Sequence, residues 1–343
     1  MLSMNPNSPE QSARAAGRAV DEPAVVRRPP LWRKALPYLG TALIFAIIFH
    51  KIPLGEVARA LGQVPVLKFV ALFLPFAVLY WLVDSFCLTW VVRRFNAPMR
   101  YSEILPIRAS MYLLSLINTS LGQGGLAYYL YRKARIPFLE ALGSILFIAV
   151  MEVYQLFLFS TAGVIFYSPS GPVQSEIVHM MRFTYVAAWI AFFVMVGLSA
   201  AARRRASVGR WLETARAGEL ARTFVKARPR DYAIVIGLKA PSFVFALIAQ
   251  FFALSMYGIP IPLGKLIVFL PLVFMAAALP IAVAHLGTLQ AGWLLFFAGS
   301  APEAKILAYS LAAHVTFMAC HGLIGVFFLP RASRELTAVE QES

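Results

Sequence analysis

The apolar stretch Ile104–Tyr131 limits what this chain can fold into more than any other part of the sequence. It has about 28 residues, whereas two helices that each cross a bilayer need roughly 40. Basic residues stand at both of its ends, and a single crossing would place them on opposite faces of the membrane, against the usual cytoplasmic bias of Lys and Arg. The stretch is therefore expected to enter the membrane and return to the same face as a re-entrant hairpin. The flanking residues are Arg93, Arg94, Arg100, Arg132, Lys133 and Arg135.

The tip of this hairpin, Asn118–Gly125, reads NTSLGQGG and is polar and rich in glycine. We expect a non-helical backbone there. Such backbone is tolerated at membrane depth only inside protein or along a water-filled cavity. The tip therefore predicts a polar cavity within the membrane.

The rest of the chain predicts an all-α polytopic membrane protein, since 60% of its 343 residues are hydrophobic and only 14% are charged. A single transmembrane domain, 35–330, is expected between a basic tail, 1–34, and a short tail, 331–343. About eight hydrophobic segments are expected, of which about six are full spans and two are interrupted hairpins. The expected spans are Ala35–His50, Val66–Val92, Phe138–Tyr167, Phe183–Ala201, Tyr232–Tyr257 and Ile306–Leu329, and the second hairpin is Leu266–Phe297.

The positions of the charges predict the topology. Most of the 31 Lys and Arg residues lie in the tails, beside the first hairpin and in the loop 203–230. This distribution predicts that both termini are cytoplasmic, and it explains the net charge of +15 without nucleic acid as a partner. The proposed outer segments hold only Lys51, Arg59, Arg182, Lys265 and Lys305.

Within the loop 203–230, apolar residues recur at helical spacing with Arg between them. The pattern predicts a helix, which lies either on the anionic inner leaflet or in the cytoplasm as an ordinary solvated helix. The apolar residues are Val208, Trp211, Leu212 and Ala215.

The two hairpins also share a short sequence pattern, which indicates an inverted repeat. In each, a Leu-Gly pair is followed by a Gln, then by a Pro at the same interval, and then by an acidic residue and Ala. Paired interrupted segments that enter from opposite faces are typical of inverted-repeat transporters, although a match this short also arises by chance. The matching positions are Leu121-Gly122, Gln123, Pro137 and Glu140-Ala141, against Leu286-Gly287, Gln290, Pro302 and Glu303-Ala304.

Two segments, Asn118–Leu142 and Leu279–Ala291, resemble the flippase-like transmembrane region of bacterial lysylphosphatidylglycerol synthases and related stand-alone membrane proteins. The family's glycines are matched by Gly122, Gly125 and Gly287. Most of the family's charged positions are not matched. In the first segment Leu126 replaces Glu and Tyr129 replaces Arg, and in the second Leu289 replaces Arg and Gln290 replaces Glu. The resemblance implies lipid handling in a bacterial inner membrane rather than lipid synthesis. We expect no aminoacyl-transferring domain of the kind those synthases carry, because the sequence continues only briefly after the last expected span.

Charged residues at membrane depth are the strongest site candidates, because a charge in the bilayer is costly and usually functional. Arg108 lies near the start of the first hairpin, where it either binds a lipid phosphate or extends to the cytoplasmic face. Lys239 is expected in a cavity or an ion pair. Glu152 and Asp84 are plausible partners for a buried base, and a structural ion pair is at least as well supported as a transport role.

The breaks of the hairpins supply the remaining candidates. Exposed amides of Gly122, Gly124 and Gly125 would bind an anionic headgroup, with Gln123 beside them. In the second hairpin the candidates are His285, Gly287 and Gln290, and His285 would bind phosphate or a proton.

No spacing in the sequence indicates a catalytic triad, a nucleotide-binding loop, a metal site or a cofactor. We therefore expect an inner-membrane flippase or transporter of a polar or amphipathic lipid, working through a cavity between the two hairpins and not as an enzyme. The alternative is a non-transporting accessory or binding protein of a lipid or glycan pathway. The expected partners are membrane lipids, anionic phospholipids among them, and enzymes of such a pathway.

Overall fold

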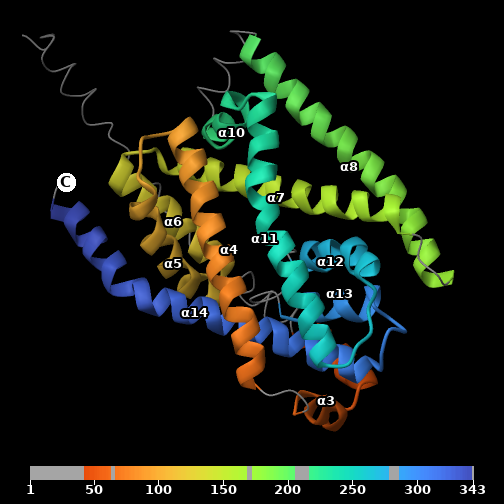
Figure 1. Ribbon diagram of the computed structural model, residues 1–343. Coiled ribbons are helices and arrows are strands. Elements are labelled where there is room, and N and C mark those ends of the chain that lie inside the picture. The colour runs from red at the N-terminus through yellow and green to blue at the C-terminus, as the bar shows by residue number, and fades with distance from the viewer. Residues whose placement is uncertain (1–41, 63–65, 168–171, 205–215, 278–285, 342–343) are drawn as a thin grey trace, which may run out of the picture.

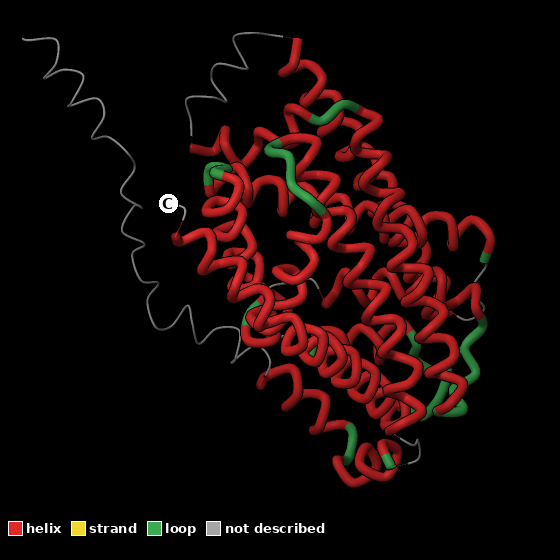
Figure 2. The backbone as a smooth tube through the Cα atoms, turned by 60° about the vertical axis from the view of Figure 1, so that its left-hand side comes forward, coloured by secondary structure: helices red, strands yellow, loops and turns green. Residues whose placement is uncertain are grey.

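The computed structural model describes residues 42–62, 66–167, 172–204, 216–277 and 286–341, and these residues form helices and connecting turns without any strand (Figures 1 and 2). The helices in order are α3 (Leu54–Leu61), α4 (Val66–Phe95), α5 (Tyr101–Ile117), α6 (Thr119–Ala134), α7 (Phe138–Phe166), α8 (Pro172–Arg204), α10 (Arg216–Lys226), α11 (Pro229–Met256), α12 (Leu263–Ala277), α13 (Thr288–Phe296) and α14 (Glu303–Gln341).

Five of these helices are long and apolar enough to cross a membrane, and they correspond to five of the six predicted spans. They are Val66–Phe95, Phe138–Phe166, Val178–Arg204, Pro229–Met256 and Glu303–Arg334. The remaining predicted span, Ala35–His50, begins outside the described residues. Only its later part is described, in the helix Ala42–Lys51. The multi-pass all-α fold predicted from the sequence is thus confirmed.

The core consists of two clusters of buried apolar side chains. The larger one includes Phe73 on α4 and Phe269 on α12, and the other includes Phe147 on α7. Phe73, Phe147 and Phe269 are completely buried in it. Burial of large aromatic side chains stabilises the helix contacts even where lipid surrounds the bundle, because the packing is denser than lipid packing.

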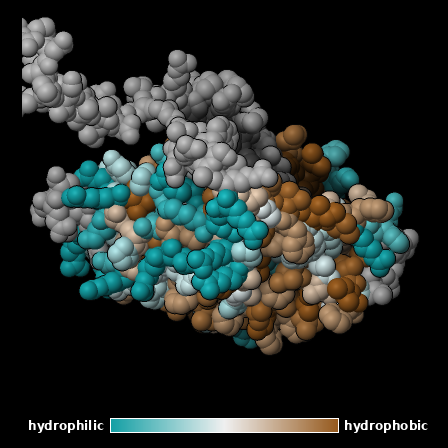
Figure 3. Space-filling view, turned by 90° about the horizontal axis from the view of Figure 1, so that it is seen from above, coloured by the Kyte–Doolittle hydropathy of each residue, from teal (hydrophilic) through white to brown (hydrophobic). Residues whose placement is uncertain are grey.

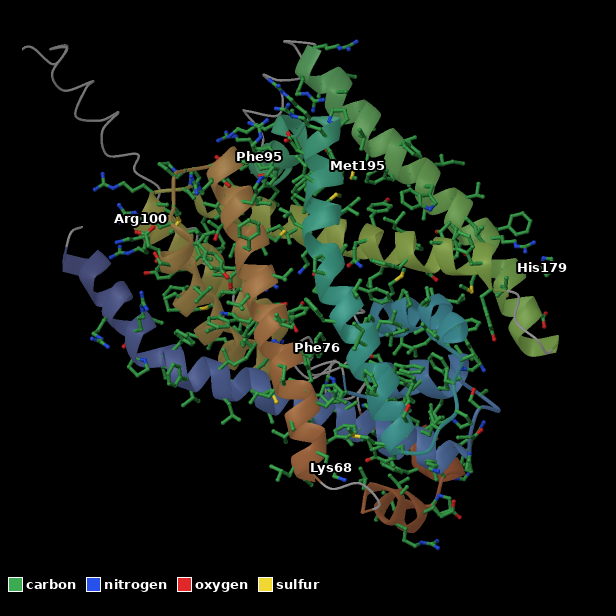
Figure 4. All side chains as sticks on the ribbon, in the orientation of Figure 1. Lys68, Phe76, Phe95, Arg100, His179 and Met195 are labelled. Atoms are coloured by element: carbon green, nitrogen blue, oxygen red, sulfur yellow. The ribbon has the colours of Figure 1, made fainter. Side chains whose placement is uncertain are left out.

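One end of the bundle gathers the basic residues, and we call it the basic end. Here α4 ends and α5 and α7 begin, since Asn96 Nδ2 donates to Glu140 Oε1 at 3.1 Å. The start of α11 lies at the same end, where Arg94 Nε pairs with Asp231 Oδ1 at 3.2 Å. Figure 4 shows Phe95 and Arg100 together at this end, with Lys68 at the far end of α4.

Acidic side chains at the basic end also fix where two helices start. The Arg100 amide donates to Glu103 Oε2 at 2.7 Å, and the Arg228 amide donates to Asp231 Oδ2 at 2.7 Å. Each acid thereby satisfies an amide that has no partner within its own helix. The carboxylates also lie near the positive end of the helix dipole, which favours them.

Helix α10 docks against α7 at the basic end through a group that we call the Glu140 cluster: Glu140, Asn96, Arg222 and Lys226. Arg222 Nη1 lies 2.7 Å from Glu140 Oε2, and Lys226 Nζ lies 2.8 Å from Glu140 Oε1. The backbones also approach closely, because a Cβ added at Gly143 would lie 2.4 Å from the Leu220 carbonyl oxygen. The apolar helix predicted around Trp211 lies outside the described residues.

The first hairpin consists of α5 and α6, which pack against each other with their open ends at the basic end. The arms are about 25 Å long at 1.5 Å per residue, short of the roughly 30 Å of a bilayer core. The turn is sharper than predicted. Only Asn118 lies outside the helices, with extended backbone at φ −160°, and its Oδ1 accepts from the Ser120 amide at 2.7 Å.

The prediction of a non-helical tip over Asn118–Gly125 is therefore wrong, since residues 119–125 form the first turns of α6. The glycines serve close packing instead of a turn. An added Cβ at Gly122 would lie 1.9 Å from Ser115 Oγ, and one at Gly125 would lie 2.7 Å from Met111 Sδ. A larger side chain at either position would push the two arms apart.

The second hairpin, α12 and α13, enters from the end opposite to the first, as the inverted arrangement requires. Lys265 Nζ at the start of α12 donates to Ser300 Oγ, just beyond α13, at 2.8 Å. The arms are shorter, about 22 Å and about 14 Å. Residues 278–285, which include Pro280, lie outside the described residues.

Seen from the top of Figure 1, the molecule has a hydrophilic side and a hydrophobic side (Figure 3). The outward faces of the spans carry large apolar side chains, such as Phe193 and Phe327, which are 65% and 77% exposed. An apolar exterior of this kind suits a lipid environment.

Candidate functional site

Four charged side chains from four different helices meet in the middle of the bundle. This ion quartet consists of Asp84 on α4, Arg108 on α5, Glu152 on α7 and Lys239 on α11. Asp84 is its centre: Oδ1 accepts from Lys239 Nζ at 2.8 Å, and Oδ2 accepts from Arg108 Nε. Lys239 Nζ also lies 3.1 Å from Glu152 Oε2.

The members of the quartet differ in exposure. The side chain of Lys239 is 0% exposed and that of Asp84 5%, whereas Arg108 is 12% and Glu152 34% exposed. Two cations and two carboxylates leave no net charge. That balance makes the burial tolerable, because an isolated ion at membrane depth costs several kcal/mol.

The structure thus brings together the four charges that the sequence analysis placed at membrane depth. The ion-pair interpretation of Asp84, Glu152 and Lys239 is confirmed. Arg108 does not extend toward the basic end of the bundle, because its Nε is held by Asp84.

Two tyrosines complete the site, and the sequence analysis missed both. Tyr80 donates its hydroxyl to Glu152 Oε1 at 3.3 Å, and Tyr112 donates to Asp84 Oδ2 at 3.3 Å. Each ring also lies 5.3 Å from a cation, Lys239 Nζ for Tyr80 and Arg108 Cζ for Tyr112. A signal was available, because each tyrosine is four residues from a charge on its own helix and therefore on the same face.

A small pocket of ≈ 40 Å³ lies beside the quartet. It has room for water, but not for a lipid headgroup in this conformation. Its polar lining comes from three members of the quartet and from Gln123, whose buried Oε1 has no hydrogen-bond partner among the described residues. The full lining is Asp84, Leu88, Arg108, Gln123, Leu126, Ile145, Ile148, Ala149 and Glu152.

The pocket is therefore built by α4, α5, α6 and α7, and none of the described residues of α12 or α13 lines it. This differs from the predicted cavity between the two hairpins. The four charges lie on α4, α5, α7 and α11, so the polar residues of the site lie next to the first hairpin.

A second and larger groove, of ≈ 690 Å³, lies between α7 and α8. Its lining is mostly apolar, and Arg182 is its charged member. Trp189 Nε1 donates to Thr161 Oγ1 at 3.1 Å across the groove.

The glycines of the first hairpin do not present amides to the pocket. Gly122 and Gly125 lie in helical turns against α5, and Gly124 faces open space, with nothing within 4 Å of an added Cβ. The role predicted for their amides as an anion site is not supported by this helical backbone, because helical amides donate along the helix.

In the second hairpin, Gly287 adopts φ 93°, a conformation that favours glycine, and stands just before α13. Its amide donates to Gln290 Oε1 at 2.7 Å, so this glutamine caps its own helix. Gln290 Nε2 is buried without a partner among the described residues. His285 lies outside the described residues.

The described residues contain no group of three or more His, Cys, Asp or Glu side chains that could hold a metal. Cys87 and Cys320 are free and buried.

A bundle of apolar spans, two opposed helical hairpins and a neutral ion quartet at mid-span define a polytopic α-helical membrane protein with a polar interior site. The model of the family "Lysylphosphatidylglycerol synthase TM region" matches residues 34–325. This chain belongs to that family, as the resemblance of its two hairpins predicted. No curated protein matches the chain.

Proposed function

We propose that this protein handles a polar or amphipathic lipid in a bacterial inner membrane, as a flippase or transporter with both termini in the cytoplasm. The headgroup would enter beside the ion quartet while the acyl chains stay in the bilayer. In this proposal the chain catalyses no reaction and uses neither cofactor nor metal.

The observation that carries the proposal is the ion quartet beside a pocket that is lined by Glu152, the most exposed member of the quartet. Charges at membrane depth are retained mainly where a polar ligand, an ion or a proton passes. Arg108 is suited to a phosphate, because its guanidinium still has donors beyond the Nε that Asp84 holds. The family to which the chain belongs is named for the membrane part of a lipid synthase, which supports a lipid as ligand.

Reconstitution into vesicles with a fluorescent phospholipid tests this function. Wild-type protein should make inner-leaflet lipid accessible to a membrane-impermeant quencher faster than empty vesicles do. Gln123→Ala should slow that rate about fivefold, the equivalent of one hydrogen bond in the pocket. Leu121→Ala, two residues away with a 54% exposed side chain, is the matched control and should leave the rate unchanged.

The size of the pocket favours a second candidate function, a non-transporting accessory or binding protein of a lipid or glycan pathway. A volume of ≈ 40 Å³ admits no headgroup unless the side chains rearrange. This alternative predicts no lipid movement in vesicles under any ion gradient, together with a pathway enzyme or lipid that copurifies with the protein.

A further inference from the structure

Glu152 differs from the other members of the ion quartet in how firmly it is held. Asp84 has three partners, Arg108, Lys239 and Tyr112, and its side chain is 5% exposed. Glu152 has Lys239 and Tyr80, at 3.1 and 3.3 Å, and its side chain is 34% exposed. Glu152 is therefore the carboxylate that can leave the quartet with the smallest loss of contacts.

The Glu152 carboxylate also lies where a ligand anion would bind. It lines the pocket together with Arg108, and it is bonded to the buried ammonium of Lys239. The pocket holds ≈ 40 Å³ with this side chain in place, too little for a phosphate group. A phosphate that reaches Lys239 through the pocket must therefore displace Glu152.

The charge balance then decides the protonation state of the displaced group. A phosphate diester carries one negative charge, so its entry would leave the site with one uncompensated charge at membrane depth, which is strongly unfavourable. Neutrality returns if the Glu152 carboxylate takes up one proton from the bulk solution, passed on by water in the pocket, and becomes a carboxylic acid. The neutral acid no longer needs Lys239 as a partner.

We propose that Glu152 is a proton-binding site coupled to headgroup binding: its carboxylate holds the anion position at Lys239 when the site is empty, and it takes up one proton when a phosphate diester replaces it. This inference rests on the proposed lipid function and adds a proton as the coupled ion.

The other groups that face Glu152 are less suited than Glu152 to take up this proton. From α4 come Tyr80, Asp84 and Cys87, from α5 Arg108 and from α11 Lys239. His321 of α14 packs on the far side of Tyr80 and Tyr112, with ring centroids 5.5 and 4.4 Å away, and is bonded to the Phe317 carbonyl oxygen. Arg108 and Lys239 are both bonded to Asp84. From α6 the pocket receives Gln123, which does not titrate.

The charged residues on the remaining helices near α7 bind other partners or line another groove. The cations of α10 bind Glu140, about 18 Å along α7 from Glu152. Lys265 of α12 bonds to Ser300, and Arg182 of α8 lines the separate groove beside α7.

Binding of a soluble short-chain phosphatidylglycerol to the detergent-solubilised full chain, measured between about pH 5.5 and about pH 8.5, tests the coupling. Wild-type affinity should fall by up to about tenfold for each unit rise in pH, since one proton accompanies each ligand. Glu152→Gln mimics the protonated acid and should bind tightly at all these pH values. Glu56→Gln, on α3 at the opposite end, should keep the wild-type slope.

A direct measurement of proton uptake tests the coupling without any variant protein. Addition of the lipid to wild-type protein in weakly buffered solution with a pH dye should show uptake of about one proton for each lipid bound. Inorganic phosphate, added in a parallel arm, should give neither binding nor uptake. If it gives both, the anion site is one for free phosphate and the assignment to a lipid headgroup is overturned.

The outcomes separate this inference from the proposed function. Lipid binding with no pH dependence and no proton uptake, or weaker binding by Glu152→Gln, would overturn the coupling and leave the lipid function intact. No lipid binding by wild type or variant at any pH would remove the proposed function, and the coupling with it.

Discussion

The ion quartet and the Glu140 cluster are built to the same plan in two different surroundings. In each, a nearly buried carboxylate is bonded to one Arg and one Lys. At the centre of the bundle the two cations around Asp84 are 12% and 0% exposed, whereas the two around Glu140 at the basic end are 31% and 45% exposed.

The difference shows what the surroundings contribute to an ion pair. Water screens the cations around Glu140 and hydrates them when the pair is broken, so each contact there is worth little. Around Asp84 no such compensation is available, and loss of one member leaves another charge stranded. The same pairing is therefore an adjustable contact at the basic end and an obligatory one inside the membrane.

The sharpest way to break the inner site is Asp84→Asn. The substitution leaves Arg108 and Lys239 with Glu152 as their one carboxylate, and we expect a loss of about 3–5 kcal/mol in the free energy of unfolding. Denaturant titration in mixed micelles, followed by tryptophan fluorescence, measures it.

Removing a cation together with the carboxylate should recover part of this loss. Asp84→Asn combined with Lys239→Met leaves one cation and one carboxylate, so the site is again neutral. A double variant that is no more stable than Asp84→Asn would contradict an electrostatic origin of the loss.

At the basic end, Gly143→Ala tests the docking of α10 without changing any charge. The added Cβ would lie 2.4 Å from the Leu220 carbonyl oxygen, which belongs to backbone and cannot rotate away. We expect a loss of about 1–3 kcal/mol and faster hydrogen exchange along α10. Gly237→Ala on α11 is the control, because an added Cβ there has no neighbour within 4 Å. Equal exchange in α10 for both variants would mean that α10 is not held by this contact.

The sequence predicted the spans well because long apolar runs leave few alternatives in a membrane. It also predicted that Ile104–Tyr131 turns back, from its length and its flanking charges. The sequence did not show how the glycines are used, since glycine serves equally for a turn and for close helix packing. The spacing of Gly122 and Gly125, which puts both on one helix face, was the available signal for packing.

The charged members of the site were also predictable, because ionisable residues stand out in apolar segments. Their geometry was not. Asp84 and Lys239 are 155 residues apart, and no local pattern encodes a contact over that distance. Glu140 appeared in the sequence only as part of the repeat pattern, and its two cations on α10 became visible only when α10 was placed beside α7.

The smallest expected effect is that of Glu140→Gln, and its dependence on salt completes the comparison. Gln keeps the shape of the side chain, but its single oxygen can replace only one of the two carboxylate oxygens, either the one that accepts from Asn96 and Lys226 or the one that accepts from Arg222. The variant therefore loses the charge and part of the hydrogen bonding. Because both cations remain hydrated, we expect a loss of about 1 kcal/mol at low ionic strength. Raising the salt to about 0.5 M shortens the screening length to a few Å and should remove most of the electrostatic part of that difference. The loss caused by Asp84→Asn should stay the same over this range, because ions do not reach a buried pair. Equal salt dependence for the two variants would mean that water reaches both sites alike, and the distinction between an inner and an outer pairing would fail.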